Sequence, residues 1–429
     1  MERGTMNNDA ERDSLAEAKA DFRSTIKANL RWFANSGVME PSDGKWGVAE
    51  RIAVLEGNEA AGKMLESFPA WTDFPGGAVI EQRRPDCNFE TALLFLLAGD
   101  VFQDTEYRNT AENILDFLYN RSGLLNRSLG DFPKASWNWS HICWKPALWF
   151  DDNGWVAALQ MLIGSRWPEL DRKHHCREWG LKLAEALRPA MERCLAAFKD
   201  TPPIFSEQVE AHYDPQKIWL GAVDLPHWSM PVVAALLAAD RLAPNPENER
   251  VAAECFMRLD KYFDTMNLSE LTYAAMISPL AAAQWQNPVF AKIAFLTEKR
   301  LDAAIAASPD GLLPAEHREA PAGARLADLI YTLNWAIHGF INLARFNPNG
   351  PSLAHRNRLA HFLAEIQDKN PSEKTYGCWR GMFDLSTGQW GGGNRFEGGA
   401  GSIYSGWTNA PICLAFIMMQ FDLDWQGMF

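Results

Sequence analysis

The chain has 429 residues, of which 47% are hydrophobic and 12% are aromatic. This composition is too apolar for a disordered protein and suffices for a large buried core. The formal net charge is −13, and the basic residues are scattered along the chain without a basic stripe. Binding to nucleic acid depends on such a stripe, so we expect a globular protein with no nucleic-acid partner.

Membrane and export signals are not evident in the sequence. No run reaches the eighteen or so apolar residues of a membrane span, and residues 1–12 are polar where a signal peptide would be apolar. We therefore expect a cytoplasmic protein without membrane contact. No Ser/Gly-rich linker divides the chain, so residues 14–429 are interpreted as one catalytic domain after an irregular segment 1–13. The oligomeric state is left open.

The seven cysteines are odd in number and include no close C-x-x-C pair. This pattern indicates neither a disulfide framework nor a zinc site, and the cysteines are interpreted as mostly buried thiols. His174 and His175 fall at the start of a helix away from the expected functional face. We expect neither a metal nor another cofactor.

Helical patterns recur in pairs joined by short turns. Five pairs follow one another along the chain: 88–101 with 106–119, 152–166 with 170–198, 227–242 with 247–266, 269–285 with 288–307, and 324–346 with 352–367. The last helix, 405–421, has no successor and is expected to pair with the N-terminal helix 14–36. This pairing would close a ring of six helical hairpins.

Composition divides the helices into two layers. First members such as 232–239 are apolar nearly all round, as helices buried on every side must be. Second members such as 247–259 carry one apolar stripe and one charged face. The sequence therefore predicts an all-α (α/α)6 toroid with inner and outer helices.

Connection lengths indicate one functional end of this ring. The long connections lead into inner helices: 37–87, 122–151, 199–226, 308–323 and 370–404. Function concentrates on loops that a rigid scaffold holds, and the helix N-termini beneath them present unpaired N–H groups. We expect the chemistry at this end.

Asp151 and Asp152 lie in the first turn of the second inner helix, and Asp86 occupies the equivalent place one hairpin earlier. Each could be an N-cap, but a cap needs only one Asp. A second carboxylate adds like-charge repulsion, which together with burial keeps an acid protonated near neutral pH. Adjacent helices lie roughly 8–10 Å apart, so Asp86 and Asp152 can form the carboxylate pair of a glycosidase, with retention or inversion undecided.

Aromatic and polar residues gather on the same long connections. The candidates for contact with the substrate are Trp137, Trp139, His141, Trp144, Lys145, Trp155, Asp224, His227, Trp228, Arg395, Glu397, Tyr404 and Trp407. Trp rings stack on sugars, while His and Lys bond hydroxyls or a carboxylate. Residues 136–145 can alternatively form a buried plug, but a wall of the substrate site is the favoured interpretation. The glycine-rich segment 390–407 is interpreted as a pocket rim, since its spacing matches no phosphate-binding loop.

A ring of six hairpins with Asp at inner-helix N-termini resembles the six-hairpin glycosidase superfamily. The order of Asp86 and Asp152 is similar to that of the unsaturated glucuronyl and unsaturated rhamnogalacturonyl hydrolases, which are cytoplasmic. This resemblance implies that Asp152 is the general acid/base, protonating the C4=C5 double bond of an unsaturated uronic acid and directing water onto C5. It implies that Asp86 assists.

The Asp151-Asp152 doublet followed by Trp155 is also similar to the doublet of bacterial α-1,6-mannanases, which implies a nucleophile and an acid/base in that pair. Two further classes stay open: a polysaccharide lyase with a Tyr or His base on the same toroid, and a carbohydrate-binding toroid without catalysis. We expect a glycoside hydrolase that degrades an oligosaccharide, with a uronic-acid-containing substrate ahead of a mannoside.

Overall fold

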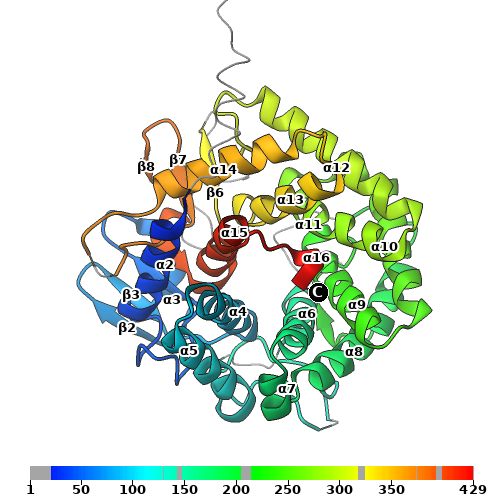
Figure 1. Cartoon of the computed structure of the whole chain (residues 1–429), viewed down its shortest axis with the longest axis horizontal. Coiled ribbons are helices and arrows are strands. Elements are labelled where there is room, and N and C mark those ends of the chain that lie inside the picture. The colour runs from blue at the N-terminus through cyan, green and yellow to red at the C-terminus, as the bar shows by residue number, and fades with distance from the viewer. Residues whose placement is uncertain are drawn as a thin grey trace, which may run out of the picture.

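The computed structural model describes residues 21–128, 130–142, 147–203, 214–316, 324–372, 374–392 and 399–428. The segment 1–13 and the beginning of the expected helix 14–36 lie outside these ranges. Within them, the helices form an inner and an outer ring, seen end-on in Figure 1.

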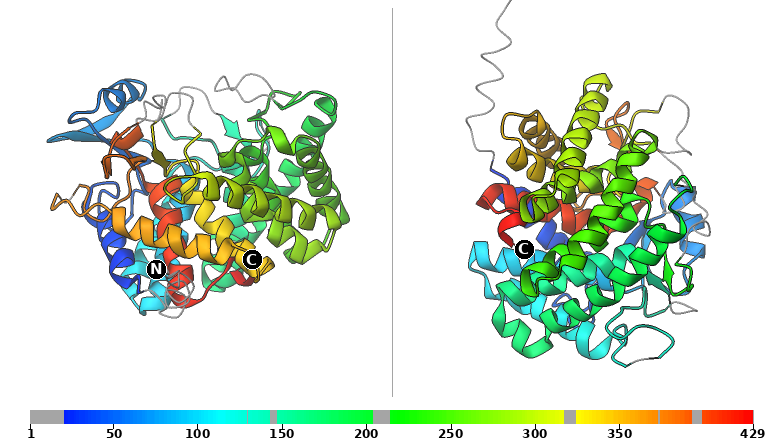
Figure 2. Two further views of the ribbon diagram at one scale, coloured as in Figure 1. Left: turned by 90° about the horizontal axis from the view of Figure 1, so that it is seen from above. Right: turned by 90° about the vertical axis from the view of Figure 1, so that its right-hand side faces the viewer.

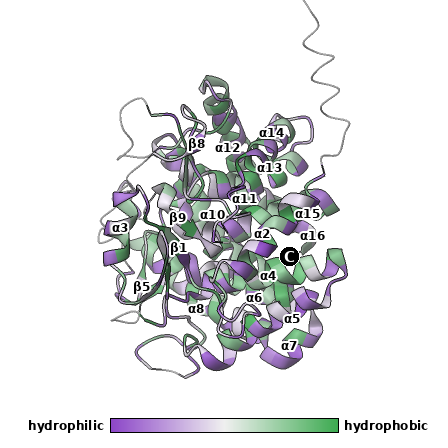
Figure 3. Cartoon of the chain, turned by 90° about the vertical axis from the view of Figure 1, so that its left-hand side faces the viewer, coloured by the Kyte–Doolittle hydropathy of each residue, from purple (hydrophilic) through white to green (hydrophobic). Residues whose placement is uncertain are grey.

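The inner ring consists of α4 (Pro85–Phe102), α6 (Phe150–Arg166), α9 (Pro226–Leu242), α11 (Leu268–Trp285), α13 (Leu333–Phe346) and α15 (Ala410–Phe421). Each of these helices packs on the next, and α15 packs on α4, so the ring is closed. Their side chains are buried almost all round, as their uniformly apolar sequences predict. In Figure 3, α4 and α6 are accordingly coloured mostly as hydrophobic.

The outer ring consists of α2 (Arg23–Asn35), α5 (Thr105–Asp116), α7 (Pro168–His174), α8 (Cys176–Ala197), α10 (Pro246–Lys261), α12 (Pro288–Ala307) and α14 (Ser352–Ile366). Helix α2 packs on α15, so the N-terminal helix closes the ring against the last helix as expected. The predicted (α/α)6 toroid is confirmed.

Two helices differ from their predicted extents. The outer helix expected over 170–198 is divided into α7 and α8, because His175 adopts a left-handed conformation (φ 57°) that ends α7. The inner helix expected over 324–346 begins only at Leu333. Ahead of it, the Asp328 carboxylate accepts the backbone N–H groups of Ile330 and Tyr331, and this local turn replaces the helix.

The long connections contain strands that the sequence analysis treats as loops. They form a four-stranded antiparallel sheet, a parallel pair and a three-stranded antiparallel sheet. The strands are β1 (Arg51–Val54), β2 (Trp71–Phe74), β3 (Gly77–Ile80), β4 (Leu148–Trp149), β5 (Trp219–Leu220), β6 (Leu326–Asp328), β7 (Met382–Asp384), β8 (Gln389–Trp390) and β9 (Ser402–Tyr404), with α3 (Glu59–Glu66) beside the first sheet.

These strands gather at one end of the toroid, above the inner helices in the left view of Figure 2. The pairing of β1 with β9 joins segments about 350 residues apart, with Arg51 opposite Tyr404. Short helical segments complete the chain: η1 (Phe117–Arg121), η2 (Phe263–Thr265), η3 (Gly399–Gly401), η4 (Ser405–Asn409) and α16 (Trp425–Met428). The end of the toroid that carries the long connections is therefore a layer of small sheets over the inner-helix N-termini.

Across the described ranges, no helix combines the length and the apolar character that crossing a bilayer requires. The described cysteines are buried free thiols, as expected from their spacing.

Candidate active site

The first turns of α4 and α6 bring three aspartates to the loop-covered end of the ring. Asp86 lies in the first turn of α4, and Asp151 and Asp152 lie in that of α6. The N-cap positions of the two helices are occupied by Arg84 and Trp149, and neither makes a side-chain capping bond. Capping therefore does not account for the three aspartates.

Arg84 connects the carboxylates of this end. Its Nη2 donates to Asp86 Oδ2 at 2.6 Å and to Asp152 Oδ1 at 2.8 Å, while Nη1 donates to Glu50 Oε1 at 2.9 Å. The sum of the first two bond lengths, 5.4 Å, is the largest possible separation of those two aspartate oxygens. Asp86 and Asp152 thus form the close carboxylate pair that the helix spacing allows.

Burial makes Asp151 and Asp152 unusually weak acids. Desolvation raises the pKa of Asp152 well above its usual value; Arg84 opposes this rise, and Asp86 and Asp151 reinforce it. Desolvation also raises the pKa of Asp151, to about 6, against the lowering effect of His227. A carboxyl that keeps its proton near neutral pH is what a general acid requires. Asp152 has this property to the greater degree.

Another buried carboxyl, Glu90, lies one helical turn below Asp86 on α4. Its two oxygens accept the indole N–H of Trp155 and the backbone N–H of Trp407, both at 2.9 Å. Trp407 in turn donates its indole N–H to Asp86 Oδ2. Desolvation, helped by Asp86, raises the pKa of Glu90 to about 8. Glu90 therefore connects Trp155 of α6 and Trp407 of η4 to Asp86 and its neighbouring aspartates.

His227 borders the other side of the doublet. It lies in the first turn of α9, with Nε2 3.9 Å from Asp151 Oδ2 and Nδ1 3.4 Å from Glu270 Oε1. Its ring packs on Trp228 with a centroid distance of 4.1 Å. The imidazole is thus close to one aspartate of the doublet and to a glutamate of α11.

Three tryptophans form a half-buried aromatic floor beside these groups. Trp149 stacks on Trp228 with centroids 5.3 Å apart, and Trp139 meets Trp149 edge-on. The parallel pairing of β4 with β5 holds the segments that carry this stack. Gly221, with φ 106°, lets Trp228 approach the backbone, because a Cβ there would lie 2.4 Å from the indole. Half-buried flat faces of this kind suit stacking on sugar rings.

Four other predicted contacts interact with neighbouring groups of the protein. Trp137 is fully buried and meets Phe89 edge-on, and Asp224 accepts a hydrogen bond from the buried Arg258. The other two are His141, whose Nδ1 accepts the backbone N–H of Arg83, and Tyr404, which lies 3.7 Å from the Arg51 guanidinium. The remaining predicted contacts, Trp144, Lys145, Arg395 and Glu397, lie outside the described residues.

The sequence analysis missed Arg84, Glu50, Glu90 and Glu270. Arg84 and Glu90 carry a signal in the sequence. Arg84 immediately precedes the helix whose first turn carries Asp86, and Glu90 follows Asp86 by one turn. Glu50 and Glu270 come from segments far from the aspartates along the chain. Only the closed ring places them beside the others.

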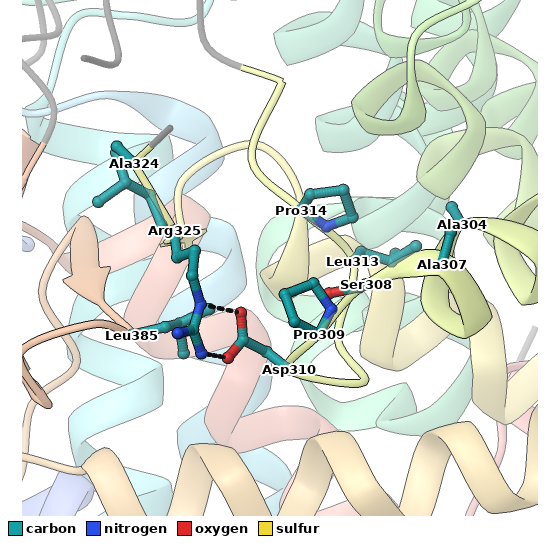
Figure 4. Close-up of a pocket in the computed structure, with 11 residues that line it drawn as sticks. Ala304, Ala307, Ser308, Pro309, Asp310, Leu313, Pro314, Ala324, Arg325 and Leu385 are labelled. Carbon is teal, nitrogen blue, oxygen red and sulfur yellow. Dashed lines mark hydrogen bonds and ion pairs between the residues drawn. The ribbon is translucent and has the colours of Figure 1, made fainter. Parts of the chain in front are cut away.

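A separate surface pocket of about 310 Å³ lies between the end of α12 and β6. Figure 4 shows it beside the ion pair of Arg325 with Asp310, among prolines and alanines. Asp86, Asp151 and Asp152 do not line it. This pocket is therefore distinct from the site formed by Asp86, Asp151 and Asp152.

No protein-family model matches the sequence, and no curated protein matches it. Solved structures do match. Cellobiose 2-epimerase from Spirochaeta thermophila superposes with a TM-score of 0.62 and 13% identity, covering 96% of this chain and 99% of that one. Unsaturated glucuronyl hydrolase from Bacillus sp. GL1 superposes with a TM-score of 0.57 and 13% identity, covering 94% of this chain and 98% of that one.

An α-1,6-mannanase from Salegentibacter, as an inactive variant with two consecutive aspartates replaced by alanine, gives a TM-score of 0.54 and 11% identity, with 93% and 99% covered. At these identities the similarity is one of fold. The chain therefore has the (α/α)6 toroid that its resemblance to the six-hairpin glycosidase superfamily predicts.

Proposed function

We propose that the protein is a glycoside hydrolase that acts on an oligosaccharide, with Asp152 as the proton donor. The observation that carries the proposal is the close pair of Asp86 and Asp152 on Arg84, with the pKa of Asp152 raised by burial. The aromatic floor of Trp139, Trp149 and Trp228 lies beside Asp151 and supports a sugar substrate. Solved enzymes of the same fold that process sugars agree with this reading.

Hydrolysis needs one carboxyl that carries a proton and one that is ionised. Asp152 donates its proton to the oxygen of the leaving group as the glycosidic bond breaks, and water supplies the hydroxyl that the anomeric carbon gains and returns a proton to the site. Asp86, which accepts hydrogen bonds from Arg84 and Trp407, is the ionised partner. Asp86 Oδ2 and Asp152 Oδ1 are at most 5.4 Å apart. In inverting glycosidases the two carboxyl groups are farther apart, roughly 6.5–9.5 Å, because a water molecule lies between them.

An unsaturated uronide is the substrate that we place first. On such a substrate, Asp152 delivers its proton to C4 of the C4=C5 double bond, and water adds at C5. The resulting hemiketal opens and releases the second sugar, so atoms and charge balance without a cofactor. The unsaturated glucuronyl hydrolase that shares the fold supports placing this substrate first.

An α-mannoside is the second candidate, and one observation favours it. Asp151 and Asp152 are both buried, yet their carboxyls have different partners, His227 and Arg84. The doublet can therefore divide the roles of nucleophile and acid between its members. The similar mannanase becomes inactive when two consecutive aspartates are replaced.

A panel of substrates separates these readings. Unsaturated disaccharides made by a lyase lose absorbance near 235 nm if the first candidate is right, whereas α-1,6-mannotetraose releases mannose if the second is right. A gain of absorbance from an intact uronan would instead show a lyase, and conversion of cellobiose to an epimer without cleavage would show an epimerase. Either of those results, or binding without turnover, overturns the proposal of hydrolysis.

A further inference from the structure

The imidazole of His227 lies between two buried carboxylates that come from neighbouring inner helices. Nδ1 faces Glu270 Oε1 of α11 at 3.4 Å, and Nε2 faces Asp151 Oδ2 of α6 at 3.9 Å. Both acids are nearly inaccessible, with 6% and 5% of their surface exposed. Three consecutive inner helices therefore contribute to one line of ionisable groups.

Glu270 is held firmly in its place. Its Oε2 accepts the backbone N–H of His227 at 2.7 Å, and its own N–H donates to Oδ1 of Asn267 at 2.8 Å. The histidine ring is fixed from its other face by Trp228. At 3.4 Å, Nδ1 lies within hydrogen-bond distance of Glu270 Oε1, so a proton on this ring nitrogen has a carboxyl oxygen to receive it.

The remaining groups around this line come from several elements. The rings of Tyr273 on α11 and of Tyr331, ahead of α13, lie 5.7 Å and 6.2 Å from the imidazole. Arg84 and Asp86 act on Asp151 from the side of the aspartate pair. Asp151 Oδ1 is buried and finds no hydrogen-bond partner among the described residues. Glu270 is the acid that the imidazole meets on the side opposite Asp151.

We infer that Glu270 is a positioning residue: it orients His227 and stabilises its protonated form, so that Asp151 is the ionised member of the doublet and Asp152 holds the proton. This inference rests on the proposed hydrolase function. The pKa directions agree, because His227 lowers the pKa of Asp151 against the effect of burial. The open choice between the two aspartates is thereby decided in favour of Asp152 as the acid.

The Glu270→Gln variant tests this role with little change in shape. The amide oxygen can still accept the backbone N–H of His227, while the amide NH2 turns toward Nδ1 and moves the ring proton to Nε2. Asp151 then loses its cationic neighbour. We expect the acidic limb of the kcat/KM profile to move up by about one pH unit. At pH 6, kcat should fall about fivefold while KM changes little, because the ionised fraction of Asp151 drops from about one half to about one tenth.

Glu316→Gln is the matched control. Glu316 also accepts a backbone N–H at the start of α11, that of Leu268. This bond does not involve His227, Glu270 or Asp151. The control should leave the pH profile unchanged. A Glu270→Gln profile that coincides with the wild type, or a Glu316→Gln profile that moves equally, overturns the inference.

A second measurement does not depend on activity. In protein labelled with 15N-histidine, the signal missing from His227→Gln identifies the ring. We expect the neutral ring to carry its proton on Nδ1 in the wild type and on Nε2 in Glu270→Gln, and the ring to lose its charge at a lower pH in the variant. Unchanged signals overturn the role of Glu270. If the signals change as expected in a protein that cleaves no glycoside, only the hydrolase proposal fails.

Discussion

Asp86 and Asp152 accept hydrogen bonds from the same nitrogen of Arg84, although 66 residues separate them along the chain. The guanidinium also pairs with Glu50, so one buried cation serves three carboxylates. Burying charge without a partner is strongly unfavourable, and this cluster therefore depends on Arg84.

Arg84→Met should lower the free energy of unfolding by about 3–5 kcal/mol at pH 8, because it leaves Asp86 and Asp152 without their cation, whereas Glu50 keeps Arg51. The loss should be smaller at pH 5, where more of these acids are protonated. Urea denaturation at the two pH values measures the difference. Arg345→Met, which removes the more exposed pair with Asp424, should change stability by no more than about 1 kcal/mol. Equal losses at both pH values would contradict this account.

Asp152→Asn should fold normally and lose about 10²- to 10⁴-fold in kcat, since amide nitrogen cannot replace the proton donor. Circular dichroism and the melting temperature check the fold, and the substrate that proves active in the panel gives kcat. Asp104→Asn is a suitable control, because Asp104 caps the outer helix α5 and Asn caps equally well. Retained turnover in Asp152→Asn would remove Asp152 from the mechanism.

The raised pKa of Glu90 predicts a pH dependence of stability. With a pKa of about 8 in the native protein and about 4.5 when unfolded, the native state binds this proton more tightly. Its contribution is therefore complete below about pH 4.5 and is lost as pH rises toward 8, by up to about 5 kcal/mol. Burial of Asp151 acts in the same direction at lower pH, up to about 6.

Glu90→Gln should flatten the decline of stability between pH 6 and 9. Both Glu90 oxygens accept hydrogen bonds, so the amide NH2 must face the N–H of Trp155 or of Trp407. One donor is then left unpaired, and we expect a loss of about 1–3 kcal/mol at pH 5. Chemical denaturation across this pH range checks the prediction, and an unchanged slope would show that Glu90 is ionised throughout.

Gly221→Ala should raise KM by displacing the stacked Trp228. A Cβ would lie 2.4 Å from the indole, and φ of 106° is unfavourable for alanine. We expect several-fold weaker substrate binding and a loss of about 1–3 kcal/mol in stability. Gly62→Ala is the contrasting variant, since its Cβ meets no atom within 4 Å in helix α3, and it should keep KM and gain about 0.5–1 kcal/mol. If KM is unchanged in Gly221→Ala, the aromatic floor does not bind the substrate.

The helices and the two layers could be predicted because they depend on local patterns. Apolar runs such as 232–239 identify inner helices, and the ring follows from their number and order. Local chemistry also explains the errors. Asp328 forms a turn where a helix is expected, and His175 divides α7 from α8. The small sheets were missed because strands of two to four residues give too short a pattern.

The sequence by itself determined the toroid, the end at which its long connections gather and the position of Asp86, Asp151 and Asp152 in the first turns of two inner helices. These features follow from helical periodicity and from the order of elements along the chain. Only the tertiary structure decided which partners those carboxyls have. The contacts of Arg84 with Asp152 and of Trp407 with Asp86 form when the ring closes. The protonation of the carboxyls follows from these contacts and from burial, because desolvation and neighbouring charges act through space and leave no pattern in the sequence.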